Sequence, residues 1–157
     1  MEYRKMMLGE AFDVARLHNQ LVYYIKGETD DAYFNFDELA EEDLGNMLRA
    51  FINDPVKRIY VAKDYDNITG FIAGEIINCF LPISKIAKVG YVAGAYVLPE
   101  YRGKGIMTNL EQMLTNFFKE NAISYVELNV ISKNLPAKRS WEGLGYTTFR
   151  EQMRKKI

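Results

Sequence analysis

Residues 97–108 read Val97-Leu98-Pro99-Glu100-Tyr101-Arg102-Gly103-Lys104-Gly105-Ile106-Met107-Thr108. They join a strand pattern over residues 89–98 to a helical pattern over residues 104–120. The first amides of a helix lack partners within it, and the helix dipole places partial positive charge there. Two glycines carry no Cβ that would hold a phosphate off the backbone, while Arg102 and Lys104 add two cations. The run therefore predicts a helix N-terminus that binds an anion, above all a diphosphate.

The same residues are also compatible with a turn that binds nothing. This alternative is a tight Arg-Gly-Lys-Gly turn with solvated charges, and the pattern alone leaves it open. Two well-known phosphate loops do not fit. A Walker A loop needs Ser or Thr after its lysine, whereas Lys104 is followed by Gly105. A dinucleotide-binding fingerprint needs a third glycine where this chain has Thr108, and it lies near the first strand of its fold.

The patterns on either side of the turn predict an α/β fold in a single domain over residues 1–157. The expected strands are Tyr3–Met7, Arg58–Lys63, Ile68–Asn78, Val89–Leu98, Ser124–Val130 and Tyr146–Met153. The expected helices are Glu10–Ile25, Phe36–Ile52, Lys104–Glu120 and Pro136–Leu144. This order describes a mixed sheet with helices packed on its faces.

Local signals set several of the expected boundaries. Gly27 should end the first helix. Asn35 should cap the second helix, and the side chain of Glu38, three residues later, should accept a hydrogen bond from the Asn35 amide. Gly94, inside a strand pattern, predicts a β-bulge.

Composition excludes several classes of protein. Cys79 is the only cysteine and His18 the only histidine, so we expect no internal disulfide and no Cys/His zinc site. His18 lies on the apolar stripe of the first helix, and a packing role is expected for it, as for Cys79. No stretch approaches the ~20 apolar residues that span a bilayer. We expect a cytoplasmic protein without a membrane partner.

Charge is distributed unevenly along the chain. Residues 1–88 hold 10 Lys/Arg and 15 Asp/Glu, whereas residues 89–157 hold 10 and 6. Eight Asp/Glu occur between Lys26 and Arg49 without a basic residue. A polyanion should prefer the second half and a cation the first, although two solvated surfaces explain the counts equally well. The balance is too mild for a nucleic-acid-binding protein.

The run at residues 97–107 resembles the acetyl-CoA motif of the GCN5-related N-acetyltransferases (GNAT), in which a strand ending V-x-P-x-Y-R is followed by G-x-G. Residues 134–146, with Asn134, Ala137 and Gly145-Tyr146, resemble the family's later N-x-x-A…G-F/Y segment. The order of elements is similar along essentially the whole chain. The resemblance implies a mostly antiparallel mixed sheet of six to seven strands, flanked by about four helices, with the strands at 89–98 and 124–130 splayed apart.

The resemblance also implies acetyl-CoA as acyl donor and no metal. Pantetheine would pair with the backbone of one strand end, the pyrophosphate would lie on the turn, and an asparagine would bind the pantetheine arm. The implied cofactor-binding residues are Tyr96, Val97, Arg102, Gly103, Lys104, Gly105, Ile106, Met107, Thr108 and Asn134.

Two positions depart from the family's pattern. Met107 stands where Gly or Ala is usual, so its side chain should turn toward the core. Trp141 stands where many relatives have a tyrosine that protonates the departing thiolate. An indole N–H does not release a proton near neutral pH, whereas a thiolate with a pKa of about 8.5 can leave and be protonated by water. We therefore expect Trp141 to pack rather than to act as the acid.

A carboxylate is also missing from the central strand, where relatives often have one. The run Tyr91-Val92-Ala93-Gly94-Ala95 contains none, and Glu75 and Glu127 are the nearest candidates by element. Glu75 is the preferred candidate base, because apolar neighbours could raise its pKa. A half-exposed structural glutamate is the alternative.

The resemblance favours an enzyme that passes an acetyl group from acetyl-CoA directly to a primary amine of a small molecule or peptide. A non-catalytic acyl-CoA-binding sensor or adapter on the same fold is the alternative. Acceptor choice should lie in residues 27–35 and 78–88, and the acidic segment favours a cationic amine. A homodimer is compatible with the resemblance.

Overall fold

The computed structural model describes residues 1–157. Five strands form one sheet in the order β1-β2-β3-β4-β5. They are β1 (Glu2–Lys5), β2 (Lys57–Asp64), β3 (Asn67–Asn78), β4 (Lys88–Val97) and β5 (Val126–Glu127). The first three pairings are antiparallel and the β4–β5 pairing is parallel. The sheet is therefore mixed and mostly antiparallel, as expected, but it has fewer strands than the six or seven predicted.

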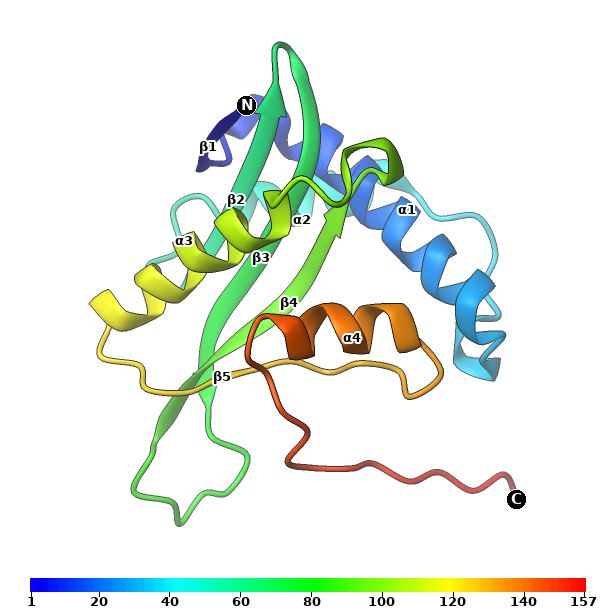
Figure 1. The fold of residues 1–157 in the computed structure, drawn as a ribbon, viewed down its shortest axis with the longest axis vertical. Helices are drawn as coiled ribbons and strands as arrows, with labels where there is room; N and C mark the ends of the chain where they lie inside the picture. Colours follow the sequence, from blue (N-terminus) through cyan, green and yellow to red (C-terminus); the bar gives the residue numbers. More distant parts are fainter.

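Four α-helices cover the two faces of the sheet (Figure 1). They are α1 (Ala11–Thr29), α2 (Glu41–Ala50), α3 (Ile106–Glu120) and α4 (Leu135–Gly143). Buried side chains of α1 and α2 pack on one face, and those of α3 on the other, where Trp141 of α4 joins them. No helix is both long and apolar enough to cross a bilayer.

Two expected helix boundaries are wrong. Gly27 does not end α1, which continues to Thr29 and ends at Asp30 in a left-handed conformation (φ 45°). Gly27 lies inside the helix, and no close contact requires glycine there, because a Cβ at this position would meet nothing within 4 Å. The second helix begins at Glu41 rather than after Asn35, with three acidic residues in its first turn facing the positive end of the helix dipole.

The pairing of β4 changes midway along the strand. Ala73 of β3 faces Gly94, and the next residue of β3 faces Val92, so Ala93 is left unpaired in a bulge. This confirms the predicted bulge to within one residue. On its other side, β4 pairs with β5 only at Gly90 and Tyr91. From the bulge onward β4 and β5 separate, and this edge of β4 is open. The two strands are therefore splayed, as expected.

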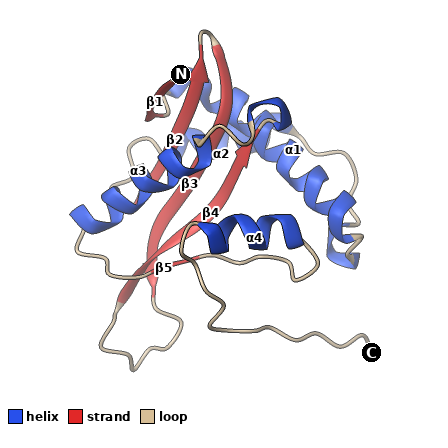
Figure 2. Cartoon of the chain, viewed as in Figure 1, coloured by secondary structure: helices blue, strands red, loops and turns tan.

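The predicted last strand is absent. Residues after α4 form no helix or strand, and they run as an extended tail beneath α4 (Figure 2). The expected strand at 124–130 is likewise reduced to Val126–Glu127. A strand needs a straight edge with free backbone groups, and β5 is too short to offer one. Side-chain contacts of Phe149 and Arg154 hold the tail instead.

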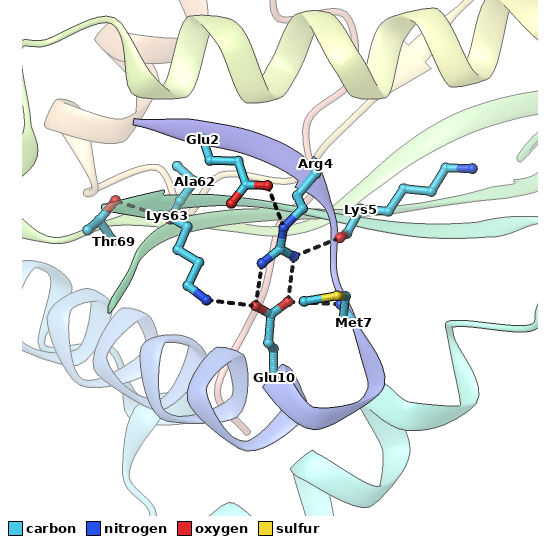
Figure 3. Close-up of polar contacts among 8 residues, drawn as sticks. All are labelled: Glu2, Arg4, Lys5, Met7, Glu10, Ala62, Lys63 and Thr69. Carbon is cyan, nitrogen blue, oxygen red and sulfur yellow. Dashed lines mark hydrogen bonds and ion pairs between the residues drawn. The ribbon is translucent and has the colours of Figure 1, made fainter. Parts of the chain in front are cut away.

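A compact polar cluster fixes the start of α1 against β1 (Figure 3). Two nitrogens of Arg4 donate to the Glu10 carboxylate at 2.8 and 2.6 Å, and the Met7 amide donates to it at 2.9 Å. Lys63 of β2 lies 3.7 Å from the same carboxylate. The hydrogen bonds from Arg4 are the largest cause of the lowered pKa of Glu10, which stays ionised although it is only 8% exposed. The cluster orients α1 along the sheet.

Candidate functional site

The open edge of β4 presents backbone groups of two residues. The Leu98 amide donates a hydrogen bond to Thr69 O at 2.9 Å. This hydrogen bond lies next to the facing pair Gly70 and Val97. In an antiparallel ladder this pattern turns both the N–H and the C=O of Val97 away from β3. The alternation places those of Ala95 on the same side and those of Tyr96 toward β3. An added strand at this edge would therefore meet the backbone of Val97 and Ala95. Tyr96, predicted to pair through its backbone, turns that backbone toward β3, and its ring is buried in the core cluster on the α1 side.

The turn after β4 has the geometry that an anion site requires. Gly103 (φ 73°) and Gly105 (φ 75°) both adopt left-handed conformations, which favour glycine. Gly105 is the N-cap of α3, and no side chain caps that end of the helix. The first amides of α3 are therefore free to bind a ligand. Thr108 is exposed one turn into the helix.

The next two residues anchor the turn. Ile106 is 2% exposed in the core between α3 and the sheet. Met107 is half-buried and packs against the same core cluster, so its side chain turns inward as expected. The backbone at Met107 remains at the open end of the helix.

Arg102 ties the end of β4 to the turn. Its Nε donates to Val97 O at 2.9 Å. Its guanidinium carbon lies 5.1 Å from the ring centroid of Tyr24 in α1 and 5.2 Å from that of Tyr96 in β4. Within this distance a cation is attracted to the face of an aromatic ring. Arg102 therefore shapes the loop and fixes it to α1, and Tyr24 is a contributor that the sequence patterns did not single out.

A second contact holds the turn to the β2–β3 hairpin. The Tyr101 hydroxyl donates to Asp64 at 3.1 Å, and this hydrogen bond raises the pKa of Tyr101. Lys104 lies over the Tyr101 ring, with its nitrogen 4.9 Å from the centroid. Lys104 is exposed, so its charge remains available to a ligand at the turn.

Asn134 begins α4 and is almost fully buried, at 4% exposure. Its side-chain oxygen accepts a hydrogen bond from the Ala137 amide at 3.4 Å, as an N-cap does. The side-chain oxygen of Asn134 therefore caps the helix, and the side-chain nitrogen is free to donate to another group. This explains in physical terms why an asparagine precedes Ala137 by three residues.

Trp141 is half-buried and belongs to the packing around α4. Its ring meets that of Tyr146 edge-on, at 5.3 Å between centroids. The Tyr146 hydroxyl donates to Glu111 of α3 at 3.0 Å. Burial, followed by the nearby carboxylate of Glu111, raises the pKa of Tyr146, which keeps its proton. These contacts dock α4 onto α3.

Glu75 lies in a row of residues across the sheet. Facing pairs place Lys57, Glu75, Tyr91 and Glu127 side by side on β2 to β5. Tyr91 is the last residue of β4 that pairs with β5, so the two candidate carboxylates flank the point where the strands separate. The structure thus brings Glu75 and Glu127 to the apex of the splay. The cross-strand neighbours of Glu75 are Lys57 and Tyr91 rather than the apolar side chains that the sequence suggested.

His18 packs behind the bulge. A Cβ placed on Gly94 would lie 3.6 Å from His18 Cδ2, and the His18 ring is 6.3 Å from that of Phe71. Its Nδ1 is buried without a hydrogen-bond partner. Burial lowers the pKa of His18, which favours the neutral ring. Cys79, half-buried, is a free thiol.

Comparison with known proteins agrees with this geometry. A family model described as "Acetyltransferase (GNAT) family" matches residues 21–146. No curated protein sequence matches the chain significantly.

Solved structures share the fold over nearly their whole lengths. A mutant of the BH1408 protein from Bacillus halodurans superimposes with a TM-score of 0.86 at 22% identity, covering 100% of this chain and 99% of that one. The aminoglycoside 6'-N-acetyltransferase AAC(6')-Ig from Acinetobacter haemolyticus gives 0.78 at 16% identity, with coverages of 100% and 99%. AAC(6')-Iy, bound to the bisubstrate analogue CoA-S-monomethyl-acetylneamine, gives 0.79 at 13% identity, with coverages of 99% and 97%. At these identities the likeness is one of fold.

Proposed function

This chain belongs to the GNAT acetyltransferase family, and from that membership we propose that it transfers an acetyl group from acetyl-CoA to a primary amine of a small molecule or peptide. One observation carries the proposal. The open edge of β4, with the outward-facing backbone of Val97, leads directly into the uncapped N-terminus of α3. Such an edge suits an extended amide-containing chain, and such a helix end suits a diphosphate.

The residues of this site have distinct proposed roles. The amides at the start of α3, with Lys104 and Thr108 beside them, would hold the pyrophosphate. Arg102 would keep the turn aligned with β4, and the side-chain nitrogen of Asn134 would donate to the pantetheine arm. The N–H of Val97 would polarise the thioester carbonyl. No residue needs to form a covalent bond with the acetyl group.

The reaction requires little further chemistry from the protein. The amine nitrogen attacks the carbonyl carbon, the bond between that carbon and sulfur breaks, and the proton of the amine is lost to a base or to water. Glu75 is the proposed base, acting directly or through water at the apex of the splay. Trp141 donates no proton, and the thiolate is protonated by solvent. Alignment of the two substrates supplies most of the rate.

A second function follows from a specific observation. The run of β4 over residues 91–95 contains no carboxylate, and Trp141 stands at the position of the usual acid. A protein that binds acyl-CoA without turnover, as a sensor or adapter, would tolerate both features.

A turnover assay distinguishes the two functions. Release of free CoA thiol from acetyl-CoA is measured over a panel of aminoglycosides, polyamines and peptides, with amine-free reactions as the control. Acceptor-dependent thiol release supports the enzyme. Tight acetyl-CoA binding with no release above the control across the panel supports the sensor. A cytoplasmic location and a homodimer remain predictions, to be tested by fractionation and by light scattering.

A further inference from the structure

The C-terminal tail, residues 147–157, connects the two segments to which the sequence assigns acceptor choice. At one end, Phe149 packs against Phe80 in the β3–β4 loop, with 6.1 Å between ring centroids, and Arg150 lies over Phe80 at 4.3 Å. At the other end, Arg154 reaches Asp31 in the connection between α1 and α2. The tail thus passes beneath α4 from one loop to the other (Figure 1).

The contact at Asp31 has the form of a cation-binding subsite. Two guanidinium nitrogens of Arg154 donate to the two carboxylate oxygens at 2.9 and 2.7 Å. The Arg154 guanidinium carbon also lies 4.3 Å from the centroid of the Tyr33 ring. A planar fork on a carboxylate, backed by an aromatic face, is a specific way to bind a guanidinium group.

This carboxylate is positioned by the chain itself. The Tyr33 amide donates to Asp31 Oδ1 at 3.0 Å, so the short turn at Ala32–Phe34 orients both the carboxylate and the ring. Seven of the eight acidic residues between Lys26 and Arg49 are exposed, whereas the Asp31 side chain is only 13% exposed. The orientation of the Asp31 carboxylate is therefore set in part by a backbone amide of the same turn, independently of Arg154.

The subsite also lies near the candidate cofactor site. Lys133, the residue before Asn134, is close enough to act electrostatically on the Asp31 carboxylate. The α1–α2 connection and the loop before α4 are therefore neighbours. A ligand group bound at Asp31 would therefore sit on the same side of the molecule as the loop that carries Asn134.

We propose that Asp31 and Tyr33 form a subsite for a guanidinium or ammonium group of the acceptor, and that Arg154 occupies this subsite in the free protein. The statement that the ligand is an acceptor rests on the proposed function. The existence of a cation subsite at Asp31 and Tyr33 does not. A cationic acceptor displaces Arg154, and residues 147–157 then leave their position between the two segments assigned to acceptor choice, residues 27–35 and 78–88. An acceptor with two basic groups, one bound and one reacting, fits this arrangement.

The Arg154 contact suits a displaceable occupant. The Arg154 side chain is 46% exposed, so water screens its charge and the long side chain loses freedom on binding, and both effects offset part of the gain from the bidentate geometry. For a ligand that must compete with this contact, the apparent affinity equals the intrinsic affinity multiplied by the fraction of protein in which the subsite is free. Removing the competitor should therefore tighten binding about three- to tenfold.

The test measures binding of agmatine, which has a guanidinium and a primary amine, by NMR titration in the absence of acetyl-CoA. Arg154→Gln should lower the Kd for agmatine about three- to tenfold. The matched variant Lys155→Gln, which removes the same charge from the next residue, should leave the Kd unchanged. Asp31→Asn keeps the oxygen that accepts from Tyr33 and should raise the Kd at least about fivefold, unlike Asp30→Asn.

Equal agmatine affinities for the wild type and Arg154→Gln would overturn the proposal, as would equal effects of Asp30→Asn and Asp31→Asn. Arg154 lies in an extended tail, so its variant folds whether or not Asp31→Asn does. The outcome is independent of the proposed function, because acetyl-CoA binding is measured separately. The variants could change agmatine binding as predicted in a protein that does not bind acetyl-CoA. This result would support the subsite and contradict the proposed acetyltransferase function.

Discussion

Arg102 Nε and the Val97 carbonyl oxygen are 2.9 Å apart, and this hydrogen bond joins the last residue of β4 to the turn that begins α3. The two parts of the proposed acetyl-CoA site are the strand edge and the helix end. One side chain therefore fixes the distance between them. The Arg102 guanidinium also lies over the rings of Tyr24 and Tyr96, and these contacts extend the same link to α1.

Arg102→Lys should weaken acetyl-CoA binding about tenfold. A lysine keeps the charge, but it loses the planar contact with two rings and the directed hydrogen bond. Calorimetric Kd values for the wild type and the variant measure the effect. Arg49→Lys, the same exchange at an arginine of α2 that lies over the Phe12 ring, is the matched control and should bind normally. Full affinity in Arg102→Lys would mean that the turn is held by other contacts.

Trp141→Phe should retain most of kcat, and Trp141→Tyr should be neutral or faster. The reason is that the indole packs on Tyr146 and has no proton to give at neutral pH. Steady-state kinetics with the best amine found would decide. A loss of about a thousandfold in kcat for Trp141→Phe, with acetyl-CoA affinity unchanged, lies in the range for a general acid and would refute the packing role.

Glu75→Gln should alter the pH dependence of kcat/KM. If Glu75 accepts the proton of the amine at the apex of the splay, the variant loses the acidic limb of the profile and about a hundredfold in rate. Glu127→Gln, on the other side of Tyr91, is the matched comparison. Identical profiles for the wild type and Glu75→Gln would assign Glu75 to the structure of the sheet.

His18 should make the folded state sensitive to mild acid. Burial lowers its pKa below the ordinary value of 6.5, so the unfolded chain binds a proton more readily than the folded one. Its contribution is therefore complete above pH 6.5 and is lost as pH falls through the lowered pKa. Chemical denaturation at about pH 7.5 and about pH 5.5 should show a smaller stability difference for His18→Gln than for the wild type. Equal differences would indicate that water reaches the ring.

The elements that the sequence predicted well are those with local causes. The turn at Gly103 and Gly105 follows from two residues that tolerate positive φ, just before a strong apolar stripe. The bulge in β4 follows from Gly94 in a strand pattern, and the separation of β4 from β5 followed from the family's fold. For the turn and the bulge, residues adjacent in the chain determine the conformation, whereas the separation of the strands was known only from the resemblance to the family.

The features that the sequence did not predict depend on distant contacts. Arg154 and Asp31 are 123 residues apart, and no periodicity links them. The segment 146–153 alternates like a strand, but whether it pairs depends on the edge that β5 provides. Tyr24 lies in α1, yet its place beside Arg102 requires the helix to be docked. Propensity alone also misplaced the end of α1, because tertiary packing carries the helix past Gly27.

Acetyl-CoA binding tests the central claim most directly. The wild-type protein should be stabilised by acetyl-CoA, by about 2.7 kcal/mol at 100 times Kd, and calorimetry should give one site per chain. Gly105→Glu should abolish binding, since it places a side chain and a negative charge at a backbone with φ 75°. Thr108→Glu adds the charge in the first turn of α3 without that strain and should weaken binding strongly, whereas Gly143→Glu, in open space at the end of α4, should bind as the wild type does. No thermal shift and no heat of binding at millimolar acetyl-CoA would contradict the account.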